Sequence, residues 1–402
     1  LLMISLLNSF NSLRQFCESQ QFKGWDPYDG LNSKVFQAIP FLKKSAFCRL
    51  AVIQGFKRLS FNLRPLFLIP KKYNAKGIAL FLQGYCNLYQ VVSHCSSLEK
   101  ALGTKEMLFK QINELAELLI VLQSKGYSGA CWGYDFDWQS KAFFLASKTP
   151  TVVATSFVVE ALLSAYEITK KETYYSSAVS AADFILDDLN RISKPRGFMF
   201  SYSPMDTRAV YNASLLGTKT LSLIYHYTRE ERLKEAARAS AIAVCDRQNE
   251  DGSFPHSDQI GNKWRDNFHT GFKLESLIIY QNLCDDTSFQ DNIQKGYTYW
   301  INHFFIPEKG IAKYYDTSDE NSLIDLHCVA QAIPTLCKLG RFDEQRLLID
   351  KLLNWAVVNM QDKKGYFYFQ KRDKKINKIN YMRWPNAWMF YGMSYWIKYS
   401  NE

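Results

Sequence analysis

The sequence lacks the short motifs that mark several large enzyme classes. It contains no glycine-rich phosphate loop with Lys-Ser or Lys-Thr and no dinucleotide-binding fingerprint after a strand. It also contains no Gly-x-Ser-x-Gly elbow and no His-Glu-x-x-His helix. These absences disfavour nucleotide-driven and serine-nucleophile chemistry, and no cofactor is expected.

A disulfide framework and a membrane-spanning run are also missing. Nine cysteines, an odd number spread over 402 residues, predict reduced thiols in the cytoplasm. No apolar stretch approaches the roughly 18 to 20 residues that span a bilayer. Residues 1–7 have no basic flank or cleavage site, so we expect them to begin a helix rather than a signal peptide. The expectation is a soluble protein, or one that rests on a membrane surface.

Acidic residues are fewer than basic ones, which gives a formal net charge of +10. The basic residues are scattered, apart from a run over 371–378. A positively charged protein attracts anionic partners, and acidic sugar polymers and phospholipid surfaces are both of this kind. A nucleic acid is not expected as a partner, because no nucleic-acid-binding fold signature accompanies the charge.

Five times, a glycine leads into a short aromatic run and then a polar loop that ends where a helix begins. The five glycines are Gly129, Gly197, Gly252, Gly310 and Gly365. Their spacing of about 55 to 68 residues suits a pair of helices with a loop. The repeats therefore predict an all-α fold, an (α/α) toroid of about six helical hairpins that forms a single domain over 1–402. Residues 1–105 repeat less clearly than 106–402 and are interpreted as diverged hairpins.

Apolar residues recur at helical spacing in about thirteen segments. The predicted helices cover 4–16, 46–59, 78–92, 112–122, 152–166, 174–189, 210–227, 233–245, 274–283, 293–305, 323–339, 347–358 and 388–397. Convincing strands are absent, although 198–202 and 366–370 suit short extended pieces at hairpin ends.

In a closed ring of hairpins the starts of the inner helices face one mouth, so polar residues at the loop ends should converge on one cavity. His269 and His327 each follow the glycine of their repeat by 17 residues, and the pair is the first candidate for acid–base catalysis. Tyr202 or Tyr211 would assist them. A structural role in bracing the helices is the alternative.

Zinc is a further alternative at this place, because His269, His327 and Cys328 are suitable ligand types. Neighbouring residues on one helix diverge by about 100°, so His327 and Cys328 rarely bind one ion together. No metal is predicted.

Arginines at three loop ends, Arg208, Arg265 and Arg383, would grip a carboxylate bidentately. Surface ion pairs are the simpler alternative for each of them. The same junctions supply Trp264, Trp384 and Asn386 as further candidates for substrate binding.

The segment 131–139 mixes aromatic and acidic residues most densely. Trp132, Tyr134 and Trp138 would stack on sugar rings, although a core position is the alternative for the two tryptophans. Cleavage by two carboxylates would use Asp26 with Asp135 or Asp137.

Several motifs together carry a resemblance to a known family. They are Gly24-Trp-Asp-Pro-Tyr-Asp-Gly-Leu-Asn-Ser33, Trp132-Gly-Tyr-Asp-Phe-Asp-Trp-Gln139, Thr149-Pro-Thr-Val-Val-Ala-Thr155, Asn267-Phe-His-Thr-Gly-Phe-Lys273 and Met382-Arg-Trp384. On these residues the chain resembles, over nearly its whole length, bacterial proteins encoded with capsule, O-antigen and exopolysaccharide genes. The resemblance implies a toroid like those of six-hairpin glycosidases, polysaccharide lyases, terpenoid cyclases and the helical domain of glucuronyl C5-epimerases. It implies a pathway and no particular reaction.

The leading hypothesis is an enzyme of surface-polysaccharide assembly, cytoplasmic or peripheral to the membrane. Its substrate would be an acidic oligosaccharide or polysaccharide, or a lipid-linked unit, changed by epimerisation, elimination or glycosidic cleavage. The competing hypotheses are a non-catalytic glycan-binding scaffold for membrane-bound glycosyltransferases and a prenyl-processing toroid.

Overall fold

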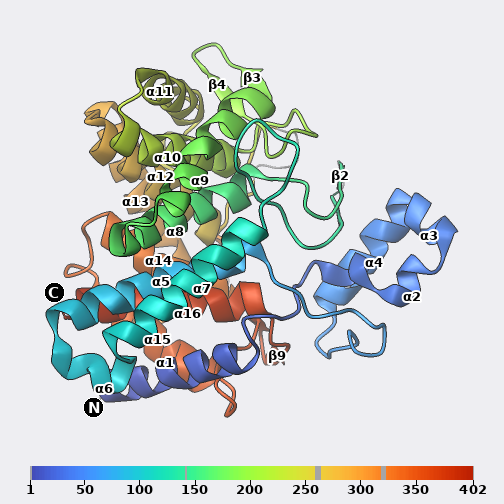
Figure 1. Ribbon diagram of the computed structural model, residues 1–402, viewed down its shortest axis with the longest axis vertical. Helices are drawn as coiled ribbons and strands as arrows, with labels where there is room; N and C mark the ends of the chain where they lie inside the picture. Colours follow the sequence, from blue (N-terminus) through green and yellow to red (C-terminus); the bar gives the residue numbers. More distant parts are fainter. Residues whose placement is uncertain (1, 141–142, 259–263, 318–322, 402) are drawn as a thin grey trace.

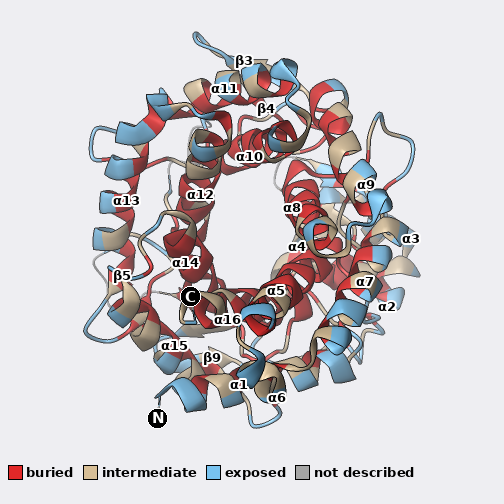
Figure 2. Cartoon of the chain, turned by 60° about the vertical axis from the view of Figure 1, so that its left-hand side comes forward, coloured by how far each residue is buried: buried red, intermediate tan, exposed pale blue. Residues whose placement is uncertain are grey.

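The chain folds into two concentric rings of helices. The computed structural model describes residues 2–140, 143–258, 264–317 and 323–401. Within these residues the inner ring closes in the order α5, α8, α10, α12, α14, α16 and back to α5 (Figure 2). The inner helices are α5 (Ala75–His94), α8 (Val152–Thr169), α10 (Tyr211–Thr228), α12 (Asn267–Cys284), α14 (Leu326–Lys338) and α16 (Ala387–Tyr399).

The outer ring consists of the helices that alternate with these along the chain. They are α1 (Leu2–Ser19), α7 (Lys105–Val121), α9 (Glu172–Asp183), α11 (Glu231–Cys245), α13 (Gln290–Phe304) and α15 (Arg346–Met360). The inner helices are red with buried residues almost throughout in Figure 2, whereas the outer helices carry exposed residues on one side. The predicted all-α toroid of six hairpins is confirmed.

Short elements connect the hairpins. The remaining helices are η1 (Asp29–Asn32), α2 (Lys34–Gln37), α3 (Pro40–Lys44), α4 (Ala46–Arg58), η2 (Ser96–Leu98), α6 (Glu99–Leu102), η3 (Phe184–Asp188), η4 (Thr287–Phe289) and η5 (Met382–Asn386). The strands are β1 (Trp138–Gln139), β2 (Phe144–Leu145), β3 (Arg191–Ser193), β4 (Phe198–Phe200), β5 (Phe305–Ile306), β6 (Ile311–Ala312), β7 (Ile324–Asp325), β8 (Gln370–Arg372) and β9 (Lys375–Asn377). They pair antiparallel as β1–β2, β3–β4, β5–β6 and β7–β8–β9.

The repeated glycines mark where each hairpin loop touches the next outer helix. A Cβ on Gly197 would lie 2.1 Å from the carbonyl oxygen of Ala239 in α11, so no other residue fits without a shift of the backbone. Gly129, Gly252, Gly310 and Gly365 lie in the same way against the carbonyls of Ser180, Lys295, Lys351 and Ser12. The last of these carbonyls belongs to α1, so the fifth repeat closes the ring onto its first helix.

One segment leaves the ring. Helices α2, α3 and α4 project from it on the side where β2 lies (Figure 1). Besides the large core of the ring there is a small core at this segment, in which Leu31 of η1 packs with Phe36 of α2 and Ile53 of α4. The predicted helix over 46–59 is present, but it belongs to this projection and not to a hairpin of the ring.

Helix α8 is long and apolar enough to cross a membrane by length and composition alone, and it is the one such helix among the described residues. Most of it, 72%, is buried inside the protein. This burial is what the core helix of a ring requires.

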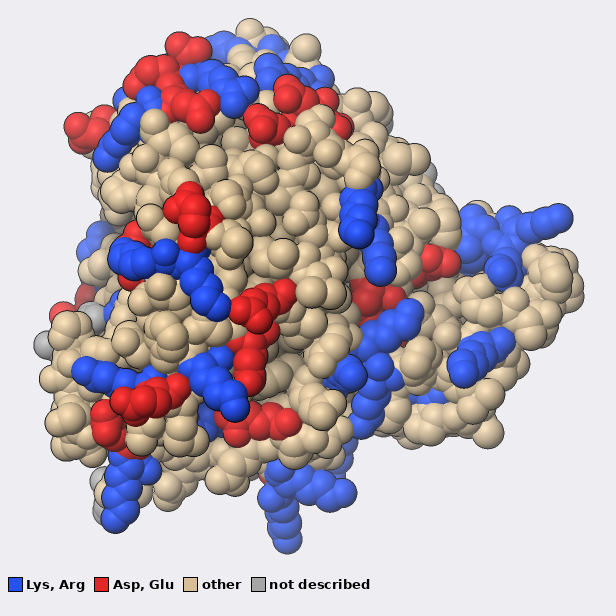
Figure 3. Space-filling model, in the orientation of Figure 1, with Lys and Arg blue, Asp and Glu red and all other residues tan. Residues whose placement is uncertain are grey.

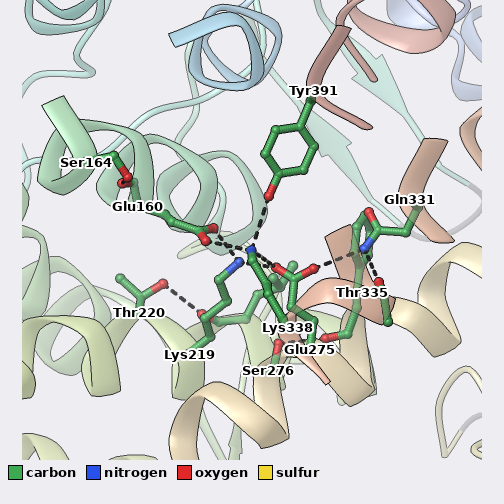
Figure 4. Close-up of polar contacts among 12 residues, drawn as sticks. Glu160, Ser164, Lys219, Thr220, Glu275, Ser276, Gln331, Thr335, Lys338 and Tyr391 are labelled. Atoms are coloured by element: carbon green, nitrogen blue, oxygen red, sulfur yellow. Dashed lines mark hydrogen bonds and ion pairs between the residues drawn. The ribbon is translucent and has the colours of Figure 1, made fainter. Parts of the chain in front are cut away.

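Four charged side chains of the inner helices α8, α10, α12 and α14 meet in the interior of the ring (Figure 4). Lys219 Nζ lies 2.5 Å from a carboxylate oxygen of Glu160 and 2.6 Å from one of Glu275. Lys338 Nζ lies 2.7 Å from each of the same two carboxylates and donates to Tyr391 Oη at 3.1 Å. The two positive and two negative charges compensate one another, which is the condition for burying them.

Candidate active site

The inner helices begin around one cavity of about 540 Å³. The second residue after the N-cap of five inner helices lines it. These residues are Lys76, Val153, Asn212, Phe268 and His327, which follow Asn74, Thr151, Val210, Asp266 and Asp325. The turn η5 before α16 supplies Arg383 and Trp384. Because helix N-termini carry partial positive charge, this arrangement favours an anion in the cavity.

His269 is held by the residue that caps its own helix. Asp266 accepts a hydrogen bond from the His269 backbone N–H at 2.8 Å, and its other carboxylate oxygen lies 2.6 Å from Nδ1 of the ring. Burial alone would raise the pKa of Asp266, but His269 and its hydrogen bonds lower the pKa below the ordinary value. An ionised Asp266 places the ring proton on Nδ1 and leaves Nε2 with a lone pair, the arrangement of an oriented general base.

His327 lies deeper, between aromatic rings. Its ring centroid is 4.2 Å from that of Phe268 and 4.1 Å from that of Trp388, and neither ring nitrogen has a hydrogen-bond partner among the described residues. Burial, then the charges of Lys76, His269 and Arg383, hold the pKa of His327 well below its ordinary value. His327 is therefore a neutral imidazole in the cavity. The ring of Phe268 also lies 4.2 Å from that of His269, so one phenylalanine contacts both predicted histidines.

A third histidine, His256, also lines the cavity and was not predicted from the sequence. It stacks on Trp264 with ring centroids 4.1 Å apart and lies 5.3 Å from the ring of His269. Burial, then the charge of His269, lowers the pKa of His256 to about 3. His256 ends the aromatic run that begins at Gly252, and this position was the signal that could have identified it.

Lys76 was missed as well. Its ammonium lies 4.4 Å from the ring centroid of Phe157, 5.1 Å from that of Phe272 and 5.2 Å from that of Trp388. It takes part in no hydrogen bond or ion pair between described residues. Burial, then the charge of Arg383, lowers the pKa of Lys76 well below its ordinary value. Lys76 and His327 are each the second residue after the N-cap of an inner helix, and this shared position was the signal that could have identified Lys76.

Arg383 lies in the wall and is fixed from behind. Asp26 accepts two hydrogen bonds from its guanidinium, at 2.5 and 2.8 Å, and both side chains are buried. The ring of Tyr134 lies 5.3 Å from Arg383 Cζ. Asp26 thus neutralises an arginine and does not itself line the cavity.

Aromatic side chains form the walls near the mouth. The hydroxyls of Tyr134 and Tyr202 are 2.8 Å apart, and Trp138 lies 5.8 Å from the ring of Tyr202. Arg208 lies over Phe143, with 5.9 Å between the guanidinium carbon and the ring centroid. Lys57 donates to the hydroxyl of Tyr28 at 2.9 Å, so the projecting segment contributes a cation to the cavity.

Nine of the predicted residues thus line the cavity together. They are His269, His327, Tyr134, Trp138, Tyr202, Arg208, Trp264, Arg383 and Trp384.

The other seven lie elsewhere for identifiable reasons. Trp132 is fully buried in the core and donates to the carbonyl of Leu119, so it is placed for packing and not for stacking on a sugar. Asn386 accepts from the backbone of Phe367 and braces the turn before α16.

Tyr211 and Arg265 have partners outside the cavity. The Tyr211 hydroxyl donates to Asp258 at 2.5 Å. Arg265 pairs with Asp316 at 2.5 Å, the surface ion pair that was the alternative reading of its role.

The acidic candidates are also behind the wall. Asp135 is partly buried and accepts from Asn74 at 2.7 Å, and its pKa is raised to about 6 by burial and then by Asp26. Asp137 accepts from the backbone of Ser147. With Asp26 bound to Arg383, the carboxylates proposed for two-carboxylate cleavage are all engaged in the frame of the cavity.

Among the described residues that line the cavity, none is Asp or Glu. Three are histidines, two are lysines and two are arginines. Cys328 is fully buried in the core, and no group of three His, Cys, Asp or Glu side chains suited to a metal occurs in the described part of the chain.

Comparisons with known proteins find similarity to sugar-active proteins. Residues 154–324 match the model of Glycosyl Hydrolase Family 88. Cellobiose 2-epimerase from Bacillus thermoamylovorans is similar in structure, with a TM-score of 0.60 and 13% identity over 81% of this chain and 89% of that one. A GH76 α-mannanase from Bacteroides thetaiotaomicron gives a TM-score of 0.59 and 13% identity over 82% and 88%.

A D-mannose isomerase is also similar, with a TM-score of 0.56 and 12% identity over 80% and 86% of the two chains. No curated protein sequence matches. The family match, together with the fold, supports the prediction of a carbohydrate-active enzyme.

Proposed function

We propose that the protein is a sugar epimerase or a related enzyme that removes a proton from the carbon beside a carbonyl or carboxylate of an acidic sugar. The observation that carries this proposal is the composition of the cavity, with three histidines and four other basic side chains but no carboxylate among its described lining residues. Such a cavity suits proton transfer by imidazole and stabilises an anion.

His269 and His327 have different surroundings and therefore different roles in proton transfer. His269 is oriented by Asp266, so its Nε2 is the better base. His327, neutral and free of hydrogen-bond partners, accepts or returns a proton at the other side of Phe268. Removal by one imidazole and return by the other inverts a stereocentre, whereas loss of a leaving group after the same first step gives elimination.

The negative charge that develops on the substrate needs fixed cations. Arg383 is held in place by Asp26 and cannot turn away, and Lys76 lies in the floor with no competing carboxylate. Cations fixed before the reaction stabilise an enolate without the cost of reorganisation. The aromatic walls suit the apolar faces of a sugar ring.

The finer proposal concerns the pathway. Acidic sugars of bacterial surface polysaccharides, as polymer or as lipid-linked unit, fit the cationic cavity. The family resemblance in the sequence motifs and the net charge of +10 support this choice. Membrane-bound glycosyltransferases would then be the partners that supply or consume the substrate.

Glycosidic hydrolysis is the second candidate, and the match of residues 154–324 to Glycosyl Hydrolase Family 88 favours it. It requires an acid placed at the scissile bond, a role that Asp266 or one of the histidines would have to take.

One experiment separates the candidates. The protein is incubated in deuterated water with uronate-containing oligosaccharides, with cellobiose and with mannose, and products are followed by NMR and mass spectrometry. Deuterium is expected at C5 of a uronate or at C2 of a reducing sugar. His269→Ala and His327→Ala should each abolish this exchange. The control His303→Ala, which changes an exposed histidine on α13, should leave the exchange unchanged. New reducing ends without deuterium would replace the proposal by hydrolysis, and no change in any sugar would overturn both.

A further inference from the structure

The projecting segment, residues 33–72, differs from the rest of the protein in what it exposes. Apolar side chains that would normally be buried are open to solvent at two places. Phe41 in α3 and Phe47 at the start of α4 are 70% and 80% exposed. Phe61, Leu66 and Leu68, in the connection to α5, are 59%, 72% and 56% exposed. A segment with its own core has no folding reason to leave these side chains outside.

The charge of the same segment is entirely of one sign. Between Ser33 and Lys72 there are nine Lys and Arg residues and no Asp or Glu, so nearly all of the net charge of +10 comes from these forty residues. The projection at the right of Figure 3 accordingly shows blue basic atoms among tan ones. Uncompensated charge of this density attracts an anionic surface.

Most of these cations are exposed. Six of the nine are exposed and take part in no ion pair between described residues, namely Lys34, Lys43, Lys44, Arg58, Lys71 and Lys72. Arg49 and Lys57 are partly buried, and Arg64 is buried and paired with Asp29 at 2.8 Å. Lys43 and Lys44 lie between Phe41 and Phe47 in the sequence, so exposed apolar side chains flank the basic pair over the turn from α3 to α4.

We propose that the projecting segment docks the protein onto a bilayer that contains anionic phospholipid. Phe41 and Phe47 enter the boundary between headgroups and acyl chains, and Lys43 and Lys44 contact the lipid phosphates. An acidic polysaccharide would satisfy the lysines but leave the phenylalanines and leucines in water. A lipid surface satisfies both kinds of side chain at once.

Docking would also bring the cavity to the membrane. Lys57 of α4 lines the cavity, and Arg49 of the same helix donates to Gln139 in β1 at 2.9 Å, beside the mouth residue Trp138. A sugar on a lipid carrier would then reach the cavity from the bilayer. This consequence rests on the proposed function, whereas docking itself does not.

The test is cosedimentation of the full chain with vesicles of phosphatidylcholine alone and with 30% phosphatidylglycerol. Binding to the anionic vesicles is expected, at least tenfold tighter than to the neutral ones and weaker at high salt. Phe41→Ser with Phe47→Ser, and Lys43→Glu with Lys44→Glu, should each weaken it about tenfold or more. Their controls are Leu347→Ser with Val358→Ser on α15, and Lys363→Glu with Lys364→Glu, which make equal changes on exposed side chains elsewhere.

Circular dichroism shows that each variant is folded, and deuterium exchange on a soluble sugar is measured in parallel. Loss of vesicle binding with unchanged chemistry supports docking independently of the reaction. Equal binding to both vesicle types, or equal loss in the controls, would overturn the proposal. Binding to an acidic polysaccharide that only the lysine variant weakens would replace the lipid by a glycan.

Discussion

The carboxylate of Asp26 accepts two hydrogen bonds from the guanidinium of Arg383, although 357 residues separate them in the chain. The pair joins the first loop of the chain to the last turn before α16 and fixes one cation in the cavity wall. Asp26 therefore acts as a positioning residue, which holds the guanidinium of Arg383 in place.

Replacement of Asp26 by Asn should lower both stability and activity. Removing one partner of a buried ion pair leaves an uncompensated charge and costs about 3 to 5 kcal/mol of unfolding free energy. Urea unfolding measures this loss, and Asp343→Asn on the surface is the control. If Asp26 were instead a catalytic acid, Asp26→Asn would lose activity while its unfolding free energy stayed within about 0.5 kcal/mol of the unchanged protein.

Replacement of Asp266 by Asn should reduce the rate about 100-fold or more, with a smaller change in KM. The side-chain amide introduced by this change can donate to Nδ1 as well as accept from it, so it no longer fixes the proton of His269 on Nδ1 and leaves Nε2 free. It can still cap α12. Steady-state kinetics on whichever sugar exchanges deuterium would measure the effect. His269→Ala should then add little to Asp266→Asn, and additive losses would contradict a shared role.

The acid limb of the pH–rate profile should depend on Lys76. The charge of Lys76 is one cause that lowers the pKa of His327, after burial, so the neutral imidazole persists below its ordinary pKa. Lys76→Met removes that charge, raises the pKa of His327 and should shift the acid limb to higher pH. Lys76→Arg keeps the charge and should leave the limb in place. If both variants shifted the acid limb equally, the charge of Lys76 would not be what sets the pKa of His327.

The sequence predicted the ring and half of the site because both depend on local patterns. Apolar spacing located the helices, and the equal offsets from Gly252 and Gly310 placed His269 and His327 at one cavity. The same pattern could not separate Trp132, which is buried, from Trp138, which lines the cavity, although the two lie six residues apart. Their difference is set by what packs on them from distant helices.

Pairing across the chain was likewise beyond local patterns. The sequence offered Asp26 and Arg383 as a catalytic acid and a substrate ligand, and only the closed ring shows that they bind each other. Lys76 was overlooked for a different reason. The repeats in the sequence are recognised by their glycines, and none of these glycines precedes α5. The residues that line the cavity instead share a position relative to the helix N-caps, and α5 has this position too.

Replacement of Trp264 by Ala should raise KM by about one order of magnitude and change kcat little. Trp264 stacks on His256 and presents a ring at the mouth, so it contributes binding area rather than proton transfer. Trp355→Ala, a partly buried tryptophan on the outer helix α15, is the control. A loss confined to kcat would indicate that Trp264 acts by positioning His256 and His269.

The buried cluster of Glu160, Lys219, Glu275 and Lys338 predicts how stability depends on pH. Burial alone would raise the pKa of Glu160, but Lys219 and Lys338 lower it to about 2. Because this value is below that of an unfolded glutamate, the unfolded chain binds more protons between about pH 5 and 2. The contribution of Glu160 is thus fully present above about pH 5 and is lost as the pH falls towards 2.

Replacement of Glu160 by Gln should therefore destabilise the protein at pH 7 by about 3 kcal/mol or more, since two buried lysines then share one carboxylate. The penalty should shrink when the same urea titrations are repeated near pH 3, where the unchanged protein has lost part of the same contribution. Glu114→Gln, an exposed carboxylate on α7, should differ little from the unchanged protein at either pH. A penalty that is equal at both pH values would mean that Glu160 stabilises the ring through packing and hydrogen bonds rather than through its charge.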